Sequence, residues 1–281
     1  MIRKEEAPRS WFRDNVDAQI VGLFSEEQDV VGATIQELVE GVATDEDLID
    51  TLLETLQQSL DEQCDETQGT AWIALILGEL EVLEALGPLL QATSCDDDEV
   101  LVMAAVRSLR RLGRPAFATI LERLEEDDDY EAAAFAAAVQ VLEGVQLHDL
   151  SDVQAEVEEA LIAYLERARA EQQFAPIAKI EAVAVALAHL GVARARPVIE
   201  AINEQLLAGN AFLQEALEIM EEQPGGVPCS AAASWLEEFH WAFGEPFDAA
   251  LADADEPEVT VTETDDERIV EIRAPRPDED S

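Results

Sequence analysis

The chain has 281 residues, of which 63 are acidic and 17 basic, so its formal net charge at neutral pH is −46. Hydrophobic residues make up 48% of the chain and aromatic residues only 5%, a composition typical of helical proteins with a substantial core. So strong a negative charge repels nucleic-acid phosphates and anionic lipids, and we therefore expect neither nucleic acid nor a membrane among its partners.

Helical spacing of apolar residues follows a lead-in of residues 1–28, which is expected to form an N-terminal cap or to be partly ordered. The first predicted helix pair covers 29–60 and turns between residues 41 and 45, and the second pair covers 69–93. Each of these helices has an apolar stripe that must be buried against a neighbouring helix. Two helices bury such stripes only in part, which predicts that the pairs stack on one another.

The third pair carries the clearest signals. Between 97 and 112 apolar residues recur at intervals of three and four positions, at Leu101, Val102, Ala105, Leu109 and Leu112. Gly113 ends this helix, and Pro115 suits the first turn of the next helix, which is predicted at 115–126.

A fourth, looser pair is predicted at 129–145 and 153–170, and a fifth pair from about 177 to 207. The fifth pair repeats the third: LRRLGRPAFATILERL (109–124) aligns without a gap on LAHLGVARARPVIEAI (187–202). The offset is 187 − 109 = 78 residues with one pair between, or about 39 residues per pair, which is the period of stacked helical pairs.

These two stretches, and more loosely LGELEVLEALGPLLQA (77–92), resemble HEAT repeats, including the variety found in phycobilisome-lyase-like proteins. The matching features are a Leu-x-x-Leu-Gly end to one helix and a Pro or Ala start to the next. The resemblance covers residues 29–207 and implies an all-α fold, a right-handed α-solenoid of about five to six antiparallel helix pairs. It also implies the scaffold or adaptor role of most HEAT proteins, although a fold alone does not determine an activity.

The C-terminal part departs from this register. Residues 208–248 are expected to form capping helices, at 211–223 and 229–243, on either side of a break at 224–228. Trp235 and Phe239 in the second helix allow two interpretations, a cap that closes the core or an aromatic docking site. Residues 249–281 are expected to be an acidic tail in which alternating Val and Ile residues predict a hairpin or an extended strand pair, followed by disorder.

Acidic clusters fall where helices are expected to begin. The candidates for partner binding among them are Asp96, Asp97, Asp98, Glu99, Asp127, Asp128 and Asp129. Carboxylates at such positions cap free N–H groups and complement the helix dipole. In a regular solenoid they would also lie along one edge, where they would steer a basic partner. They lack the glycine and the ligand spacing of calcium loops, so no metal site is expected.

Arg107, Arg111 and Arg114 share one face of the first helix of the third pair, at spacings of four and three residues. In so acidic a chain these arginines are expected to pair with carboxylates of adjacent repeats. The alternative is a binding site for an anion or a carboxylate on the inner surface, and all three are therefore candidates for partner binding.

No catalytic signature is present, because the sequence has no glycine-rich phosphate loop, zinc-ligand spacing or serine-hydrolase motif. Cys229 and His240 are eleven residues apart, about 16 Å along a helix and too far for a nucleophile and its base. Neither an enzyme nor a cofactor is therefore expected. Three widely spaced cysteines, no apolar run of about 18 residues and no apolar signal region indicate a cytoplasmic protein.

The sequence thus predicts a non-enzymatic scaffold or adaptor that presents a helical surface and an acidic edge to a protein partner. One alternative is an acidic inhibitor that mimics nucleic acid on a basic protein, and another is a lyase-like or chaperone-like role on a cofactor-bearing protein. The acidity has two explanations of its own, adaptation to salt or for solubility, or a surface for a basic partner. Its even spread along the chain favours adaptation.

Overall fold

The computed structural model describes residues 20–25, 30–35, 38, 46–61, 67–95, 98–125, 131–148, 150–171, 176–206, 209–227, 258–264 and 267–273. Contacts between residues divide the chain into two compact units, Met1–Ala231 and Ala232–Ser281. The described residues of the first unit are helical apart from turns and short connections, and those of the second form two strands.

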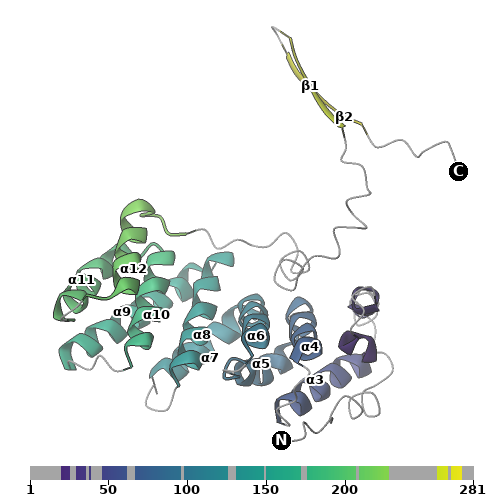
Figure 1. The fold of residues 1–281 in the computed structure, drawn as a ribbon, viewed down its shortest axis with the longest axis horizontal. Helices are drawn as coiled ribbons and strands as arrows, with labels where there is room; N and C mark the ends of the chain where they lie inside the picture. The colour runs from purple at the N-terminus through teal and green to yellow at the C-terminus, as the bar shows by residue number, and fades with distance from the viewer. Residues whose placement is uncertain are drawn as a thin grey trace, which may run out of the picture. The chain divides into compact units, whose positions relative to one another are not determined.

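Most of the described helices of the first unit lie in two rows (Figure 1). The first row consists of α4 (Thr67–Glu79), α6 (Glu99–Leu112), α8 (Ala132–Glu143), α10 (Ile177–His189) and α12 (Ala211–Glu222). Each helix of this row contacts the next. The second row consists of α3 (Glu46–Asp61), α5 (Leu86–Ala92), α7 (Arg114–Glu125), α9 (Ser151–Glu171) and α11 (Arg196–Gln205).

The two rows pack against each other. Helix α3 contacts α4, α5 contacts α6, α7 contacts both α6 and α8, α9 contacts α10, and α11 contacts α12. The largest fully buried side chains come from both rows, for example Leu56 of α3, Ile76 of α4, Phe117 of α7 and Phe135 of α8. This burial of apolar stripes is the stabilisation that the helical spacing predicts.

Short 3₁₀ helices complete the first unit: η1 (Val21–Phe24), η2 (Leu83–Ala85), η4 (Gly144–Leu147) and η5 (Ala193–Ala195). The first of these, η1, contacts α4, and the ring of Phe24 fills the space in which a side chain at Gly69 would stand. The 3₁₀ helix η1 therefore covers part of α4.

The helix boundaries agree closely with the sequence-based predictions. Helices α6 and α7 begin and end within two residues of the predicted 97–112 and 115–126, and α12 matches the predicted 211–223. The reason is local chemistry. The Asp98 carboxylate accepts a hydrogen bond from the Leu101 N–H at 3.0 Å and caps α6, and Gly113 ends that helix at φ +66°. The predicted turn at 41–45 and the predicted helix at 229–243 lie outside the described residues.

Two of the helix-ending turns have the same geometry. After α4, the Val82 N–H donates to the Leu77 carbonyl and the Glu81 N–H to the Gly78 carbonyl. The same pattern recurs after α10, where the Val192 N–H donates to the Leu187 carbonyl and the Gly191 N–H to the Ala188 carbonyl. Both turns are Schellman motifs, which place one residue in the left-handed region. The stretch 77–92 therefore resembles 187–202 in turn structure more closely than 109–124 does, although its sequence matches only loosely. A 3₁₀ helix follows the turn in the first two stretches, whereas α7 follows Gly113 directly.

Glu81 occupies the left-handed position of the first motif, at φ +52°, where the second motif has Gly191 at φ +71°. Replacing Glu81 by glycine is therefore expected to raise the free energy of unfolding by about 0.5–1 kcal/mol, because glycine adopts this conformation without steric cost. Urea denaturation followed by circular dichroism measures the change. Since the substitution also removes a charge, E81Q is the control, and a gain equal in both variants would contradict the conformational explanation.

The described residues of the second unit form an antiparallel strand pair, β1 (Glu258–Thr264) and β2 (Glu267–Arg273). Val259 pairs with Ile272 and Val261 pairs with Val270, so the register places these four residues on one face. Of the two arrangements expected from the alternating sequence, the structure has the hairpin.

Candidate functional site

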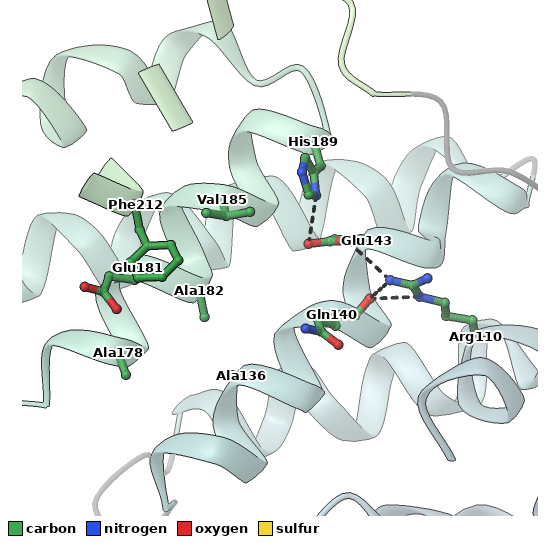
Figure 2. A pocket seen from close by; sticks show the side chains of 10 residues that line it. All are labelled: Arg110, Ala136, Gln140, Glu143, Ala178, Glu181, Ala182, Val185, His189 and Phe212. Carbon is green, nitrogen blue, oxygen red and sulfur yellow. Dashed lines mark hydrogen bonds and ion pairs between the residues drawn. The ribbon is translucent and has the colours of Figure 1, made fainter. Parts of the chain in front are cut away.

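An open pocket of about 340 Å³ lies on the first row of helices, mainly between α8 and α10. The side chains that line it, drawn in Figure 2, come mainly from α8 and α10, which form its length. Helix α12 contributes Phe212, and α6 contributes Arg110. We call this surface the α8–α10 groove. It is lined by Arg110, Ala136, Gln140, Glu143, Ala178, Glu181, Ala182, Val185, His189 and Phe212.

The middle of the α8–α10 groove is apolar. Ala136 from α8 and Ala182 and Val185 from α10 line it and are only half-buried. Phe212 stands at its side with 53% of its surface exposed. These half-buried residues and the exposed Phe212 ring are open to contact with another molecule.

One end of the groove is held by a charge network. The Glu143 carboxylate lies between Arg110 and His189, 3.3 Å from a guanidinium nitrogen of Arg110 and 3.3 Å from Nδ1 of His189 (Figure 2). Arg110 also donates to the backbone carbonyl of Gln140, from Nε at 2.9 Å and from Nη2 at 2.7 Å. These interactions join α6, α8 and α10 at this end of the groove.

His189 is connected to its surroundings by backbone and side chain. Its carbonyl accepts hydrogen bonds from Nε2 of Gln146 at 3.0 Å and from the Val227 N–H at 2.9 Å. The hydrogen bond of its ring to Glu143 raises the pKa of His189, while burial lowers it, and the carboxylates of Glu143 and Glu215 raise it further. The net effect is a pKa above the ordinary value for histidine.

The raised pKa of His189 makes part of the stability pH-dependent. Since the folded protein holds this proton more tightly than the unfolded chain, the stabilisation is complete below about pH 6.5 and is lost as the pH rises through the raised pKa. The free-energy difference between the wild type and H189Q should therefore shrink as the pH rises from about 6.5 through the raised pKa of His189. Urea denaturation at constant ionic strength measures it. The free energy of unfolding of E143Q should lack the same pH-dependent contribution. A difference between the wild type and H189Q that stays constant with pH would contradict the assignment of this contribution to His189.

The other end of the groove is fixed by Asn210. Its side-chain amide donates to the Glu181 carboxylate at 2.6 Å, and its side-chain oxygen accepts from the Leu213 N–H at 3.0 Å and so caps α12. The Asn210 N–H in turn donates to the side-chain oxygen of Asn203 at 2.9 Å. Asn210 thus links α10, α11 and α12, and its hydrogen bonds position the start of α12, which carries Phe212, relative to the groove.

The acidic candidates from the sequence lie away from this groove or outside the described residues. Asp98 caps α6, as expected from its position, and Glu99 is exposed in the first turn of the same helix. The candidates that fall outside the described residues are Asp96, Asp97, Asp127, Asp128, Asp129, Trp235 and Phe239.

Two of the three candidate arginines form ion pairs with neighbouring helices, which confirms the expected pairing for them. Arg111 pairs with Glu79 of α4, and Arg114 donates to both carboxylate oxygens of Asp152 on α9, at 2.9 and 2.7 Å. The hydrogen bond from Arg114 lowers the pKa of Asp152. Arg107 is half-buried on α6. The arginine that lines the groove is instead Arg110, which the sequence-based selection left out.

The groove residues of α8 and α10, which sequence reasoning missed, share one signal, because both helices are apolar on nearly every side. In their sequences, AAAFAAAVQVLE and IAKIEAVAVALAH, the single acidic residues are Glu143 and Glu181, and both line the groove. An acidic residue in such a helix marks the edge that faces solvent.

His189 and Glu143 form an acid–base pair, but the residues that line the groove include no serine, threonine or cysteine as nucleophile. In the described part of the chain, no group of three or more His, Cys, Asp and Glu residues is placed to hold a metal ion. Within that same part, every helix is too short or too polar to cross a bilayer.

The functional hypothesis therefore rests on the geometry of the α8–α10 groove. Comparison of the chain with known protein families and with curated proteins found no match.

Proposed function

We propose that this chain is a non-enzymatic scaffold or adaptor, an α-solenoid of HEAT-like antiparallel helix pairs that binds a protein partner. The observation that carries the proposal is the open α8–α10 groove with its exposed Phe212. Burying such a surface against a partner is favourable by about 25 cal/mol for each Å² of apolar area.

The solenoid arrangement is supported by three independent features. Successive first-row helices contact each other from α4 to α12. The Schellman turn after α4 recurs after α10. The sequence repeats with a period of about 39 residues, close to the period of known helical-pair repeats. A stack of this kind presents one extended surface, which suits a scaffold better than an enclosed active site.

Affinity capture from a host lysate tests the proposal, with the full chain as bait at about 0.15 M and about 1 M NaCl. A scaffold should retain a stoichiometric partner at the higher salt concentration, because apolar contacts are not screened. Quantitative mass spectrometry of the captured proteins gives the stoichiometry. Absence of a partner at both salt concentrations would contradict the scaffold function.

The net charge of −46 favours a second candidate, an acidic mimic that occupies the nucleic-acid site of a basic protein. The same capture distinguishes it, because a mimic should retain nucleic-acid-binding proteins only at the lower salt concentration and should lose them to added DNA or RNA.

A further inference from the structure

The outward surfaces of α8 and α10 differ from the rest of this acidic protein. Helix α9, with the sequence SDVQAEVEEALIAYLERARAE, has six acidic residues in 21, whereas α8 and α10 have one each. The residues that α8 and α10 leave partly open are mostly alanine and valine. If the acidity only adapted the chain to its solvent, these exposed positions should be acidic as well.

Helix α4 shows how the same kind of sequence is normally accommodated. It is also apolar on nearly every side, and its residues 69–78 are all buried. Part of that burial comes from η1, which contacts α4 and places Phe24 against Gly69. A helix that is apolar all round is expected to be covered on every side. Among the described residues of the first unit, no segment plays the role of η1 over Ala136, Ala182 and Val185, which line the open groove.

The charges around the groove indicate what would cover it. Arg110 is paired with Glu143, so its charge is compensated within the chain. Glu181 lines the opposite end, and Glu215 is exposed one turn after Phe212 and acts on His189 electrostatically. A partner therefore meets an apolar centre with Glu181 at one end and the Arg110–Glu143–His189 network, on which Glu215 acts, at the other. The net charge of −46 surrounds this groove with a negative field that favours a basic partner.

The dimensions match a helix. The groove follows α10 from Ala178 to His189, which is about 16 Å at a rise of 1.5 Å per residue and corresponds to three turns. The small side chains of Ala178 and Ala182 allow another helix to approach α10 closely. An amphipathic helix presents apolar residues at the spacing that such a groove requires.

We infer that the α8–α10 groove binds a basic amphipathic α-helix of a partner protein, whose apolar residues contact Ala182, Val185 and Phe212 and whose lysine or arginine residues lie against Glu181 and Glu215. This inference rests on the proposed scaffold function and names its binding site and the chemistry of its partner.

Fluorescence anisotropy with a labelled synthetic peptide tests the inference on the full chain. The probe is a helix of about 14 leucine and lysine residues with leucine at i, i+3, i+4 and i+7, and its control has the same composition in an order without an apolar face. Measurements at about 0.5 M NaCl suppress attraction by charge alone. The protein should bind the amphipathic probe at least about tenfold more tightly than the permuted peptide.

Variants locate the binding. F212S should weaken binding of the amphipathic probe by at least about tenfold, because the exposed ring is the largest apolar contact in the groove. L83S is the matched control, since Leu83 is 55% exposed and does not line the groove. A182M, which fills the groove without adding charge, should weaken binding to a similar degree. Retention of the helical circular dichroism spectrum shows that each variant is folded.

Charge variants test the second half of the inference. E181Q and E215Q should lower affinity most at low salt, whereas E99Q, an exposed carboxylate of α6 outside the groove, should have a smaller effect.

Equal loss of binding in F212S and L83S, or none in both F212S and A182M, would overturn the inference. So would self-association that depends on Phe212 in sedimentation, because a second copy would then be the occupant. If lysate capture retains a partner and F212S still retains it, the scaffold function stands and this site is wrong.

Discussion

Replacing Gly191 by alanine is expected to lower the free energy of unfolding by about 2–4 kcal/mol. Gly191 has φ +71°, which costs about 1 kcal/mol for a residue with a side chain. The larger part is steric. A Cβ at this position would lie 2.6 Å from the carbonyl carbon of Gly225 and 2.6 Å from the nitrogen of Gly226. Both are backbone atoms, so the loop after α12 would have to move and would lose the hydrogen bond from the Val227 N–H to the His189 carbonyl.

Two other glycines separate the contributions. Gly209 has φ +67°, but a Cβ there would meet nothing within 4 Å, so G209A should cost only about 1 kcal/mol. Gly87 lies in α5 with open space around it, so G87A should raise the free energy of unfolding by about 0.5–1 kcal/mol. Urea denaturation of the three variants measures the series. Equal losses in G191A and G209A would show that the close approach of the loop contributes nothing.

Truncating Phe135 to alanine is expected to cost about 3–5 kcal/mol. Phe135 of α8 is fully buried, its ring lies 5.1 Å from that of Tyr164 on α9, and Nζ of the buried Lys179 lies 5.1 Å from its centre. Removing the ring leaves a cavity at the contact between the two rows and takes away the cation–π interaction of Lys179.

The same substitution at Phe212 serves as the control. Phe212 is 53% exposed, so F212A should change the unfolding free energy by less than about 0.5 kcal/mol. Thermal and urea unfolding measure both variants. The combination matters for function, because a phenylalanine that is almost neutral for stability and necessary for peptide binding belongs to a binding surface. A large loss of stability in F212A would instead make Phe212 part of the core.

Local signals made the positions of the helices predictable. Asp98 and Asn210 cap the helices that follow them through their own side chains, and Gly113 ends α6 because glycine tolerates a positive φ. The antiparallel strand pair followed from alternating Val and Ile residues in the same way. In each case the interacting residues are close together along the chain, so their pattern can be recognised without the tertiary structure.

The geometry of the turns was harder to predict from the sequence than the positions of the helices. The gapless alignment of 109–124 on 187–202 equates Gly113 with Gly191, yet the Schellman turn at Gly191 recurs at Glu81 and not at Gly113. Glutamate gives no sign of a left-handed residue. The left-handed conformation at Glu81 is visible only in the structure, so sequence similarity ranked the three turns differently from their geometry.

By itself the sequence of this protein determined the helix boundaries, the period of about 39 residues and the excess of acid, because these depend on residue type and spacing along the chain. Only the tertiary structure decided which surfaces are covered. The sequences of α4, α8 and α10 are almost equally apolar, and η1 covers α4 while the groove over α8 and α10 stays open. Likewise Arg110 and Arg111 are adjacent in sequence, but the 100° rotation per residue of a helix directs one to Glu143 and the other to Glu79. A pattern shows that a face is apolar, whereas what covers it depends on contacts between residues far apart in the chain.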